Sequence, residues 1–192
     1  MTTQSLRQIL MTGTRARHEK LDLGIGAFDG LDAYRRYLHG SHGFRAALEP
    51  WLDGDDSGKA DQASGWSCQA LLPELTADLA DLGMAPPIAP ALPEDLRRAI
   101  TRDPAARAGV LYVLEGSGLG ARLLWRRAQA LGLTAEQGAR HLAAQTADSG
   151  RWKRFLAWLE TAGAAPEPAL AAANAAFDLA LAAQGPGWGQ AA

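Results

Sequence analysis

The chain has 192 residues with 47% hydrophobic residues and a formal net charge of −2, a balance typical of one folded domain with a substantial core, expected to span residues 1–192. Its basic residues are scattered among acidic ones, which argues against a nucleic-acid partner, and no segment approaches the roughly 20 consecutive apolar residues of a membrane span. Cys68 is the only cysteine, so no disulfide framework is expected, and no secretory signal is visible. These features favour a cytoplasmic protein.

Residues 5–22 predict the first helix. Leu6, Leu10 and Thr14 recur at intervals of four, which is typical of a helix with one buried face. His18 continues this track, so it lies on or beside the buried face. A histidine there is either a core residue with its hydrogen bonds satisfied or a metal ligand, and this helix by itself leaves both interpretations open.

A second helix is expected from Leu31 to near Pro50, interrupted near Gly40 and Gly43. His39 and His42 stand three apart and could share a helical face as a metal pair. Neither has a carboxylate at ligand spacing, and the glycines favour a solvated helix end there.

The remaining segments predict further helices and no strand. A leucine stripe predicts a helix from Cys68 to Leu82, with Cys68 as a small buried residue, and the proline-rich stretch 84–93 predicts an extended linker. A capping box places the next helix at 134–147. Two more helices are expected over 149–161 and after Pro168, which makes the fold all-α.

Gly109–Leu124, which reads GVLYVLEGSGLGARLL, carries Gly116, Gly118 and Gly120 inside an apolar run. Each glycine costs a helix interior roughly 1 kcal/mol relative to alanine, so something is expected to approach this backbone closely. The spacing is wrong for a phosphate-binding loop. Two interpretations stay open: close packing against another helix, or a kinked helix lying over a flat ligand.

Two stretches together resemble a known family. LMTGTRARHEKLD, around His18, resembles the proximal-helix pattern T-R-x-x-H-x-x-L-D of bacterial heme oxygenases, and GVLYVLEGSGLGARLL is similar to their distal-helix pattern G-x-L-Y-V-x-E-G-S-x-L-G. The likeness continues through DLADLG at 78–83, WKRF at 152–155 and the sequence around Phe177. It is greatest to the biliverdin-forming enzymes that accompany bacterial phytochromes or serve iron acquisition.

The resemblance implies a helical bundle with haem between a proximal and a kinked distal helix, haem being both cofactor and substrate. His18 would be the iron ligand, its second nitrogen held by Glu19 or by a backbone carbonyl. The distal catalytic residues that the resemblance implies are Gly116, Ser117 and Gly120. The further haem-binding residues that it implies are Arg15, Tyr112, Lys153 and Phe177.

The reaction implied is oxidative cleavage of haem to biliverdin, carbon monoxide and ferrous iron, using dioxygen and electrons from a ferredoxin or flavoprotein reductase. A bacteriophytochrome is the implied receiver of biliverdin. The main alternative is a haem carrier or sensor of the same fold. A thiamin-degrading enzyme on this fold would want a nucleophilic cysteine with acidic partners, which Cys68 lacks, and an iron-carboxylate oxidase would want Glu-x-x-His pairs, which the sequence lacks.

The chain departs from the family pattern at three positions. Met11 stands where the family often has Arg or Lys, so the resemblance does not carry over the propionate contact that a basic residue would make there. Gly13 replaces a usual alanine and weakens the proximal helix by roughly 1 kcal/mol. Gly118 is an additional glycine in the distal helix.

Overall fold

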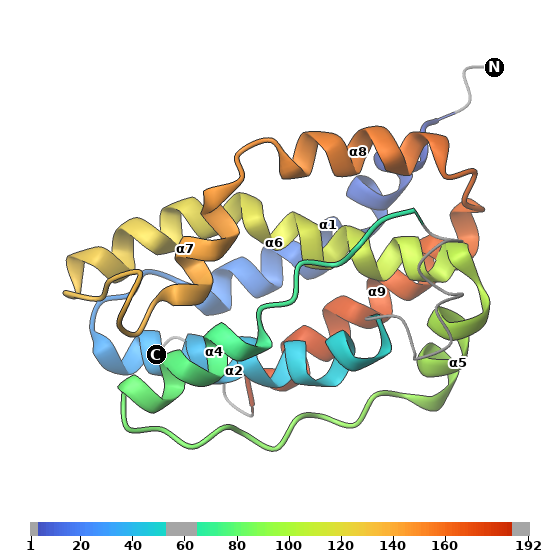
Figure 1. Cartoon of the computed structure of the whole chain (residues 1–192). Helices are drawn as coiled ribbons and strands as arrows, with labels where there is room; N and C mark the ends of the chain where they lie inside the picture. Colours follow the sequence, from blue (N-terminus) through green and yellow to red (C-terminus); the bar gives the residue numbers. More distant parts are fainter. Residues whose placement is uncertain (1–3, 53–64, 186–192) are drawn as a thin grey trace.

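The computed structural model describes residues 4–52 and 65–185. Within these ranges the regular structure is helical, apart from one isolated bridge between Thr134 and Gly138, so the expected all-α fold is confirmed. The helices, shown in Figure 1, are α1 (Leu6–Ile25), α2 (Leu31–Leu48), η1 (Glu49–Trp51), α4 (Leu72–Asp81), α5 (Glu94–Arg102), α6 (Pro104–Ala130), α7 (Arg140–Ala147), α8 (Arg151–Thr161) and α9 (Pro166–Ala183).

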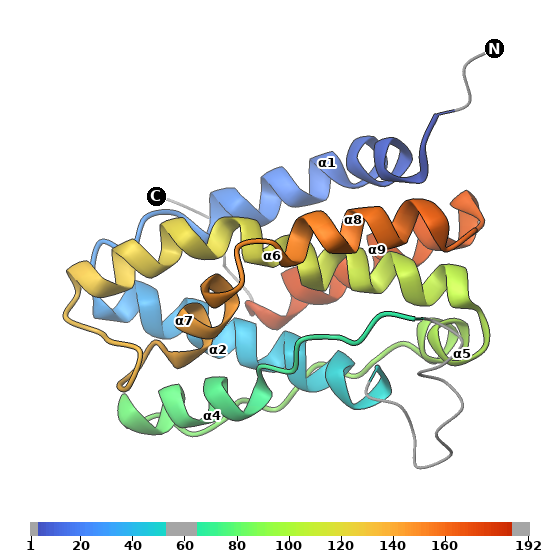
Figure 2. The same ribbon diagram turned by 45° about the horizontal axis from the view of Figure 1, so that its top comes forward.

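Helix α9 supports both α1 and α6. These two helices pack along it and run side by side in the same direction, as Figures 1 and 2 show, yet they have far less contact with each other than with α9. Helices α6 and α9 approach closely at Gly109, where a Cβ would overlap the carbonyl oxygen of Ala169. Glycine is therefore required at Gly109 for the helix axes to approach this closely.

A second core joins α2, α4 and α7 beside the first. Tyr34 and Leu38 of α2, Leu75 and Leu79 of α4, and Leu142 of α7 are buried in it. This core holds the C-terminal half of α6 through buried Ala121 and Ala128. The distal stretch of α6 is thus anchored on one side and leaves its other side toward α1.

The prediction that α2 is interrupted near Gly40 and Gly43 is wrong. The helix continues unbroken and both glycines are buried. A Cβ on Gly40 would overlap the side chain of Gln184, so this glycine serves close packing against the chain that follows α9. His42 is correspondingly buried, with Nε2 3.1 Å from Oγ1 of Thr76, and does not lie at a solvated helix end.

Helix α4 begins at Leu72 and not at Cys68, which is only partly buried in the segment before it. The carboxylate of Glu49 accepts the backbone N–H groups of Leu71 and Leu72 at 2.9 and 3.0 Å. Pro73 follows in the first turn, where its missing N–H is not needed. The prediction of a helical, buried Cys68 was therefore wrong.

Helix α7 also starts later than the sequence pattern predicts. Thr134 and Gln137 form a hydrogen-bonded turn, in which Oγ1 of Thr134 accepts the N–H of Gln137 at 3.1 Å. Gly138 follows with φ of 78°, a left-handed conformation that glycine adopts without strain, and the helix begins at Arg140. The extended linker over residues 84–93 is confirmed.

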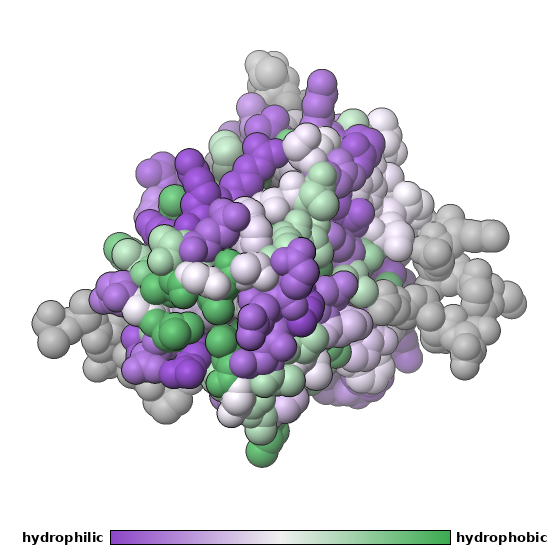
Figure 3. Space-filling view, turned by 60° about the vertical axis from the view of Figure 1, so that its left-hand side comes forward, coloured by the Kyte–Doolittle hydropathy of each residue, from purple (hydrophilic) through white to green (hydrophobic). Residues whose placement is uncertain are grey.

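Along the described ranges, none of the helices is long and apolar enough to cross a membrane. Several large apolar side chains nevertheless stay exposed, and the face seen in Figure 3 shows apolar groups gathered among polar ones. On α1 and α6 the exposed ones are Met11, Leu23, Leu119 and Leu123.

Candidate functional site

His18 is held in a defined orientation on the exposed side of α1. Its side chain is 58% exposed, and Nδ1 lies 3.0 Å from Oδ2 of Asp22. With Nδ1–H donating to this carboxylate, Nε2 is the unprotonated nitrogen and is free to bind a metal. The ring also meets the edge of buried Phe177 on α9, with centroids 5.9 Å apart.

The residues around His18 fix α1 on α9. Arg17 donates to both carboxylate oxygens of Asp178, at 2.8 and 3.2 Å, and to Asn174 at 3.2 Å. Arg15 instead pairs with Glu19 at 2.7 Å, and its hydrogen bond to Glu19 raises the pKa of Arg15. Glu19, one of the two acceptors considered for His18, is thus occupied by Arg15.

One face of α6 looks toward α1. Arg127 donates to the backbone carbonyl of Gly26, at the end of α1, at 2.6 Å. At the other end, burial raises the pKa of Tyr112, and the nearby positive charge of Arg7 partly opposes that shift. Residues 112 and 127 are about four turns apart and share a helical face, so this face follows α1 along most of its length.

Gly116 and Gly120 lie on that same face, between its two ends. Because α1 and α6 run in parallel (Figure 2), the middle of the face lies opposite the middle of α1, and His18 belongs to this middle part of Leu6–Ile25. A Cβ on Gly120 would meet nothing within 4 Å, and one on Gly116 would meet only Trp152, at 3.7 Å. Gly118 faces elsewhere, since a Cβ on it would lie 3.9 Å from the carbonyl oxygen of Gln145.

The two interpretations of the glycine-rich stretch therefore apply to different residues. Close helix packing accounts for Gly109, whose hydrogen atoms leave room for Ala169. It does not account for Gly120, which no other part of the described chain approaches. Bare backbone at Gly116 and Gly120 leaves a surface that a flat ligand can approach.

Ser117 points away from this face, toward α2 and α7. Its hydroxyl donates to the carbonyl of Leu114 at 2.6 Å and accepts from Gln145 at 2.9 Å and from Arg45 at 3.3 Å. A hydroxyl has one proton and two lone pairs, so its capacity is fully used. Arg45 is buried and paired with Glu49 at 3.0 Å, which ties this turn of α6 to α2.

The other two sequence-predicted residues lie at different edges of the site. Tyr112 is half-buried and its ring lies 5.6 Å from that of Trp152. Lys153 is exposed and lines a cavity of about 190 Å³ together with Gly118 and Leu119. Glu115 is buried and bound by Arg151 at 2.6 Å, and it lines the same cavity as Lys153 and Gly118.

Sequence reasoning missed Asp22 as the partner of His18 and Arg17 as the link to α9. The signal for Asp22 was its spacing, since residues four apart on a helix are neighbours. The Arg17–Asp178 pair joins residues distant in sequence, and only the packing of α1 on α9 brings them together. No cluster of three or more potential metal ligands is present within residues 4–52 and 65–185.

The residues present fit haem, a flat and largely apolar macrocycle with iron at its centre and two carboxylates at one edge. His18 offers a single imidazole nitrogen. Gly116 and Gly120 offer backbone without side chains, and Leu119 and Leu123 are apolar and exposed on the same helix.

Comparisons with known proteins point the same way. No family model matches the chain. A heme oxygenase from Xanthomonas campestris is 33% identical over 162 residues, which cover 81% of this chain and 90% of that protein. The heme oxygenase PigA from Pseudomonas aeruginosa is 33% identical over 166 residues, covering 83% and 80%. The crystal structure of nitric oxide- and carbon monoxide-bound heme oxygenase from Neisseria meningitidis has a TM-score of 0.75 at 27% identity, covering 99% of this chain and 95% of that one.

The fold is therefore the all-α helical fold of heme oxygenases. The extent of the similarity makes the assignment specific. The chain belongs to the heme oxygenase family and is an enzyme of that family.

Proposed function

We propose that His18 binds the iron of haem through Nε2 and that the face of α6 carrying Gly116 and Gly120 covers the opposite side of the macrocycle. The reaction is the oxidative cleavage of haem to biliverdin, carbon monoxide and ferrous iron. Haem, as substrate and cofactor, supplies the iron at which dioxygen is activated with external electrons. The protein supplies binding, orientation and space.

One observation carries the proposal. An exposed histidine, oriented by Asp22 at 3.0 Å, lies on the helix that the glycine face of α6 follows, and Gly120 has no neighbour within 4 Å of its absent Cβ. A core histidine would be buried and satisfied at both nitrogens, as His141 is with Asp78 and Tyr37.

The other residues have roles that follow from their contacts. Phe177 limits rotation of the His18 ring from the α9 side. The hydroxyl of Ser117 holds the turn before Gly118 and Gly120 in place through Arg45 and Gln145. Backbone carbonyls of this turn are then the groups that hold water beside the ligand.

Tyr112 and Lys153 serve as binding groups for haem carboxylates at the edge of the site. Tyr112 lies on the face of α6 that carries Gly116 and Gly120. Lys153 is exposed in the first turn of α8. Arg15 can take part only by leaving Glu19.

We further propose a cytoplasmic enzyme that receives electrons from a ferredoxin or a flavoprotein reductase and passes biliverdin to a bacteriophytochrome. The resemblance to phytochrome-associated family members supports the last step. The presence of a single cysteine, with no possible disulfide within the chain, supports the compartment.

The test is to load the purified protein with ferric haem and record its optical and spin-resonance spectra for wild type and His18→Ala. We expect the wild type to show nitrogen-ligated iron and the variant to lose that signature. With a reductant, dioxygen and catalase, the wild type should lose its Soret band and yield biliverdin. A return to ferric haem over repeated cycles without any bilin would identify a carrier and overturn the enzymatic role.

A further inference from the structure

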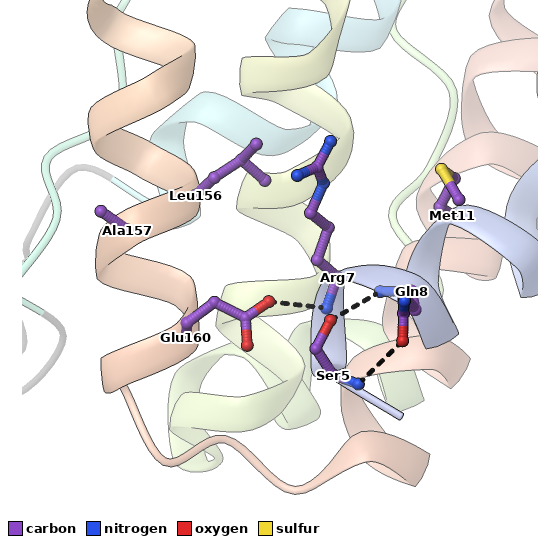
Figure 4. Close-up of a pocket in the computed structure, with 7 residues that line it drawn as sticks. All are labelled: Ser5, Arg7, Gln8, Met11, Leu156, Ala157 and Glu160. Atoms are coloured by element: carbon purple, nitrogen blue, oxygen red, sulfur yellow. Dashed lines mark hydrogen bonds between the residues drawn. The ribbon is translucent and has the colours of Figure 1, made fainter. Parts of the chain in front are cut away.

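Helix α8 has two sides with different contents. One side faces the start of α1 across a cavity of about 520 Å³, which Leu156 and Glu160 line from α8, as Figure 4 shows. Aromatic residues spaced three apart lie on another side of the same helix, since 3.6 residues make one turn. These residues are Trp152, Phe155 and Trp158.

The aromatic side chains form a continuous row of ring contacts. Trp152 borders the glycine face of α6, because a Cβ on Gly116 would lie 3.7 Å from its ring. Phe155 stacks on Trp152 with centroids 5.5 Å apart, and Trp66, from the segment before α4, meets Phe155 at 5.2 Å. Trp158 completes the row, 5.9 Å from Trp66. The row thus begins at the face proposed to cover haem and ends at two half-buried indoles.

Trp66 has a proton acceptor beside it. Its Nε1–H donates to Oε1 of buried Glu115 at 3.1 Å. Arg151 donates to both oxygens of that carboxylate at 2.6 Å, and its guanidinium also lies over the Trp66 ring, 5.1 Å from the centroid. A positive charge beside the ring opposes a second positive charge on it. Removal of an electron from Trp66 is therefore coupled to loss of its N–H proton, which Glu115 can take.

We propose that Trp152 and Trp66 supply single electrons to haem when the site meets a hydroperoxide, which gives the enzyme a further activity, the reduction of hydroperoxides. Peroxide forms when dioxygen takes two electrons and the ring is not cleaved, so a site that uses dioxygen is exposed to it. Indole is one of the side chains that lose an electron most readily. This inference rests on the proposed function, which places haem against α6 at Gly116.

The electrons and protons of this step balance. Reduction of a hydroperoxide, ROOH, to the alcohol ROH and water breaks the O–O bond and takes two electrons and two protons. One electron comes from haem and the other from Trp152, and both protons come from solvent. Trp66 then returns an electron to Trp152 across Phe155, and its Nε1 proton passes to Glu115. The external reductant gives one electron back to haem and one to Trp66, which recovers its proton.

The test mixes haem-loaded protein with tert-butyl hydroperoxide, freezes the sample at once and records its spin-resonance spectrum, which distinguishes tryptophan from tyrosine radicals. Wild type, Trp66→Phe and Trp125→Phe are compared. Trp125 is the matched control, because it is a partly buried tryptophan of α6 that packs against the second core and not against this row. Thermal unfolding of the three apoproteins checks that they are equally folded.

We expect wild type to give a tryptophan radical, Trp66→Phe to lose most of that signal and Trp125→Phe to keep it. If Trp66→Phe unfolds at a lower temperature, peptide mass spectrometry of the wild type decides instead. Oxygen added to Trp66 in the haem-loaded protein and not in the apoprotein would support the proposal, and an unmodified Trp66 would contradict it.

Two further results would overturn the assignment of Trp66 alone, provided that the wild type shows nitrogen-ligated iron and forms biliverdin. One is a radical on tyrosine in place of tryptophan, and the other is an equal tryptophan signal in wild type and an equally folded Trp66→Phe. A wild type without nitrogen-ligated iron would overturn the proposed function as well.

Discussion

His18 and Asp22 form a hydrogen-bonded pair one turn apart on α1, with Nδ1 and Oδ2 separated by 3.0 Å. Both side chains are more than half exposed, so the pair contributes little to folding. Its effect is on orientation, because a carboxylate on Nδ1 fixes the tautomer and the direction of the ring.

Asp22→Ala should therefore weaken haem binding about tenfold, the lower end of what loss of such a partner costs a metal site. The dissociation constant from optical titration measures this. Glu19→Ala is the matched control, since Glu19 lies one residue from His18 but pairs with Arg15. An equal loss of affinity in both variants would mean that the general negative charge of α1 matters and the contact with Asp22 does not.

Gly109 and Gly120 provide a test of what each glycine in α6 is for. Gly109→Ala should destabilise the protein by about 1–3 kcal/mol, because its Cβ overlaps the backbone of α9. Gly120→Ala should stabilise the apoprotein by up to about 1 kcal/mol through helix propensity, since no atom opposes the new methyl group. Urea unfolding of the two apoproteins gives both values.

The same Gly120→Ala variant should slow biliverdin formation, and Gly120→Leu should slow it further, while His18 still ligates the iron. A bilin yield that stays at the wild-type rate in both variants would show that the bare backbone at this position is not used by the ligand.

The His141–Asp78 pair predicts how stability changes with pH. Burial lowers the pKa of His141 below its ordinary value. Burial alone would raise the pKa of Asp78, but hydrogen bonds from the His141 side chain and from the backbone of Arg140 and His141 bring it below its ordinary value. Both shifts act in one direction, since the unfolded chain binds protons more readily than the folded one.

Stability should therefore be full above the ordinary histidine pKa and fall as pH decreases from about 7 to 5, with a further loss when Asp78 is protonated at lower pH. Thermal midpoints across that range measure the effect. In His141→Gln the midpoint should be lower at neutral pH and less dependent on pH between about 7 and 5. An unaltered slope in the variant would assign the pH dependence to other groups.

Arg17→Gln should separate stability from binding. The ion pair with Asp178 is largely exposed, so its loss should cost about 0–1 kcal/mol of unfolding free energy. Haem affinity should fall by a larger factor, because Arg17 directly precedes His18 and joins α1 to α9. A haem affinity equal to wild type, measured beside Arg35→Gln as a control, would contradict this role.

The sequence predicts the helices well where a long apolar stripe faces one core. Helices α1 and α8 and the linker at 84–93 lie where periodicity and proline placed them, whereas α9 begins at Pro166 and includes the prolines that were expected to precede it. Failures occur where a residue distant in sequence decides the local structure. α2 continues through Gly40, beside which the side chain of Gln184 lies, and α4 begins where Glu49 accepts two backbone N–H groups.

The site divides in the same way. His18 and Gly120 could be singled out from residue type and spacing. The orienting role of Asp22 and the full use of the Ser117 hydroxyl depend on which side-chain conformations the packed helices select. Periodicity carries no information about those choices.

The two hydrogen bonds from Arg17 to Asp178 fix the orientation of α1 relative to α9. This ion pair opposes rotation of α1 about its own axis, so α9 determines the direction in which His18 projects. The glycine turn of α6 has a second support, through Arg45 and Glu49 against α2 and α4. Because α9 packs on both α1 and α6, it links the two sides of the site, and a substitution on α9 should change the positions of His18 and of the glycine turn together.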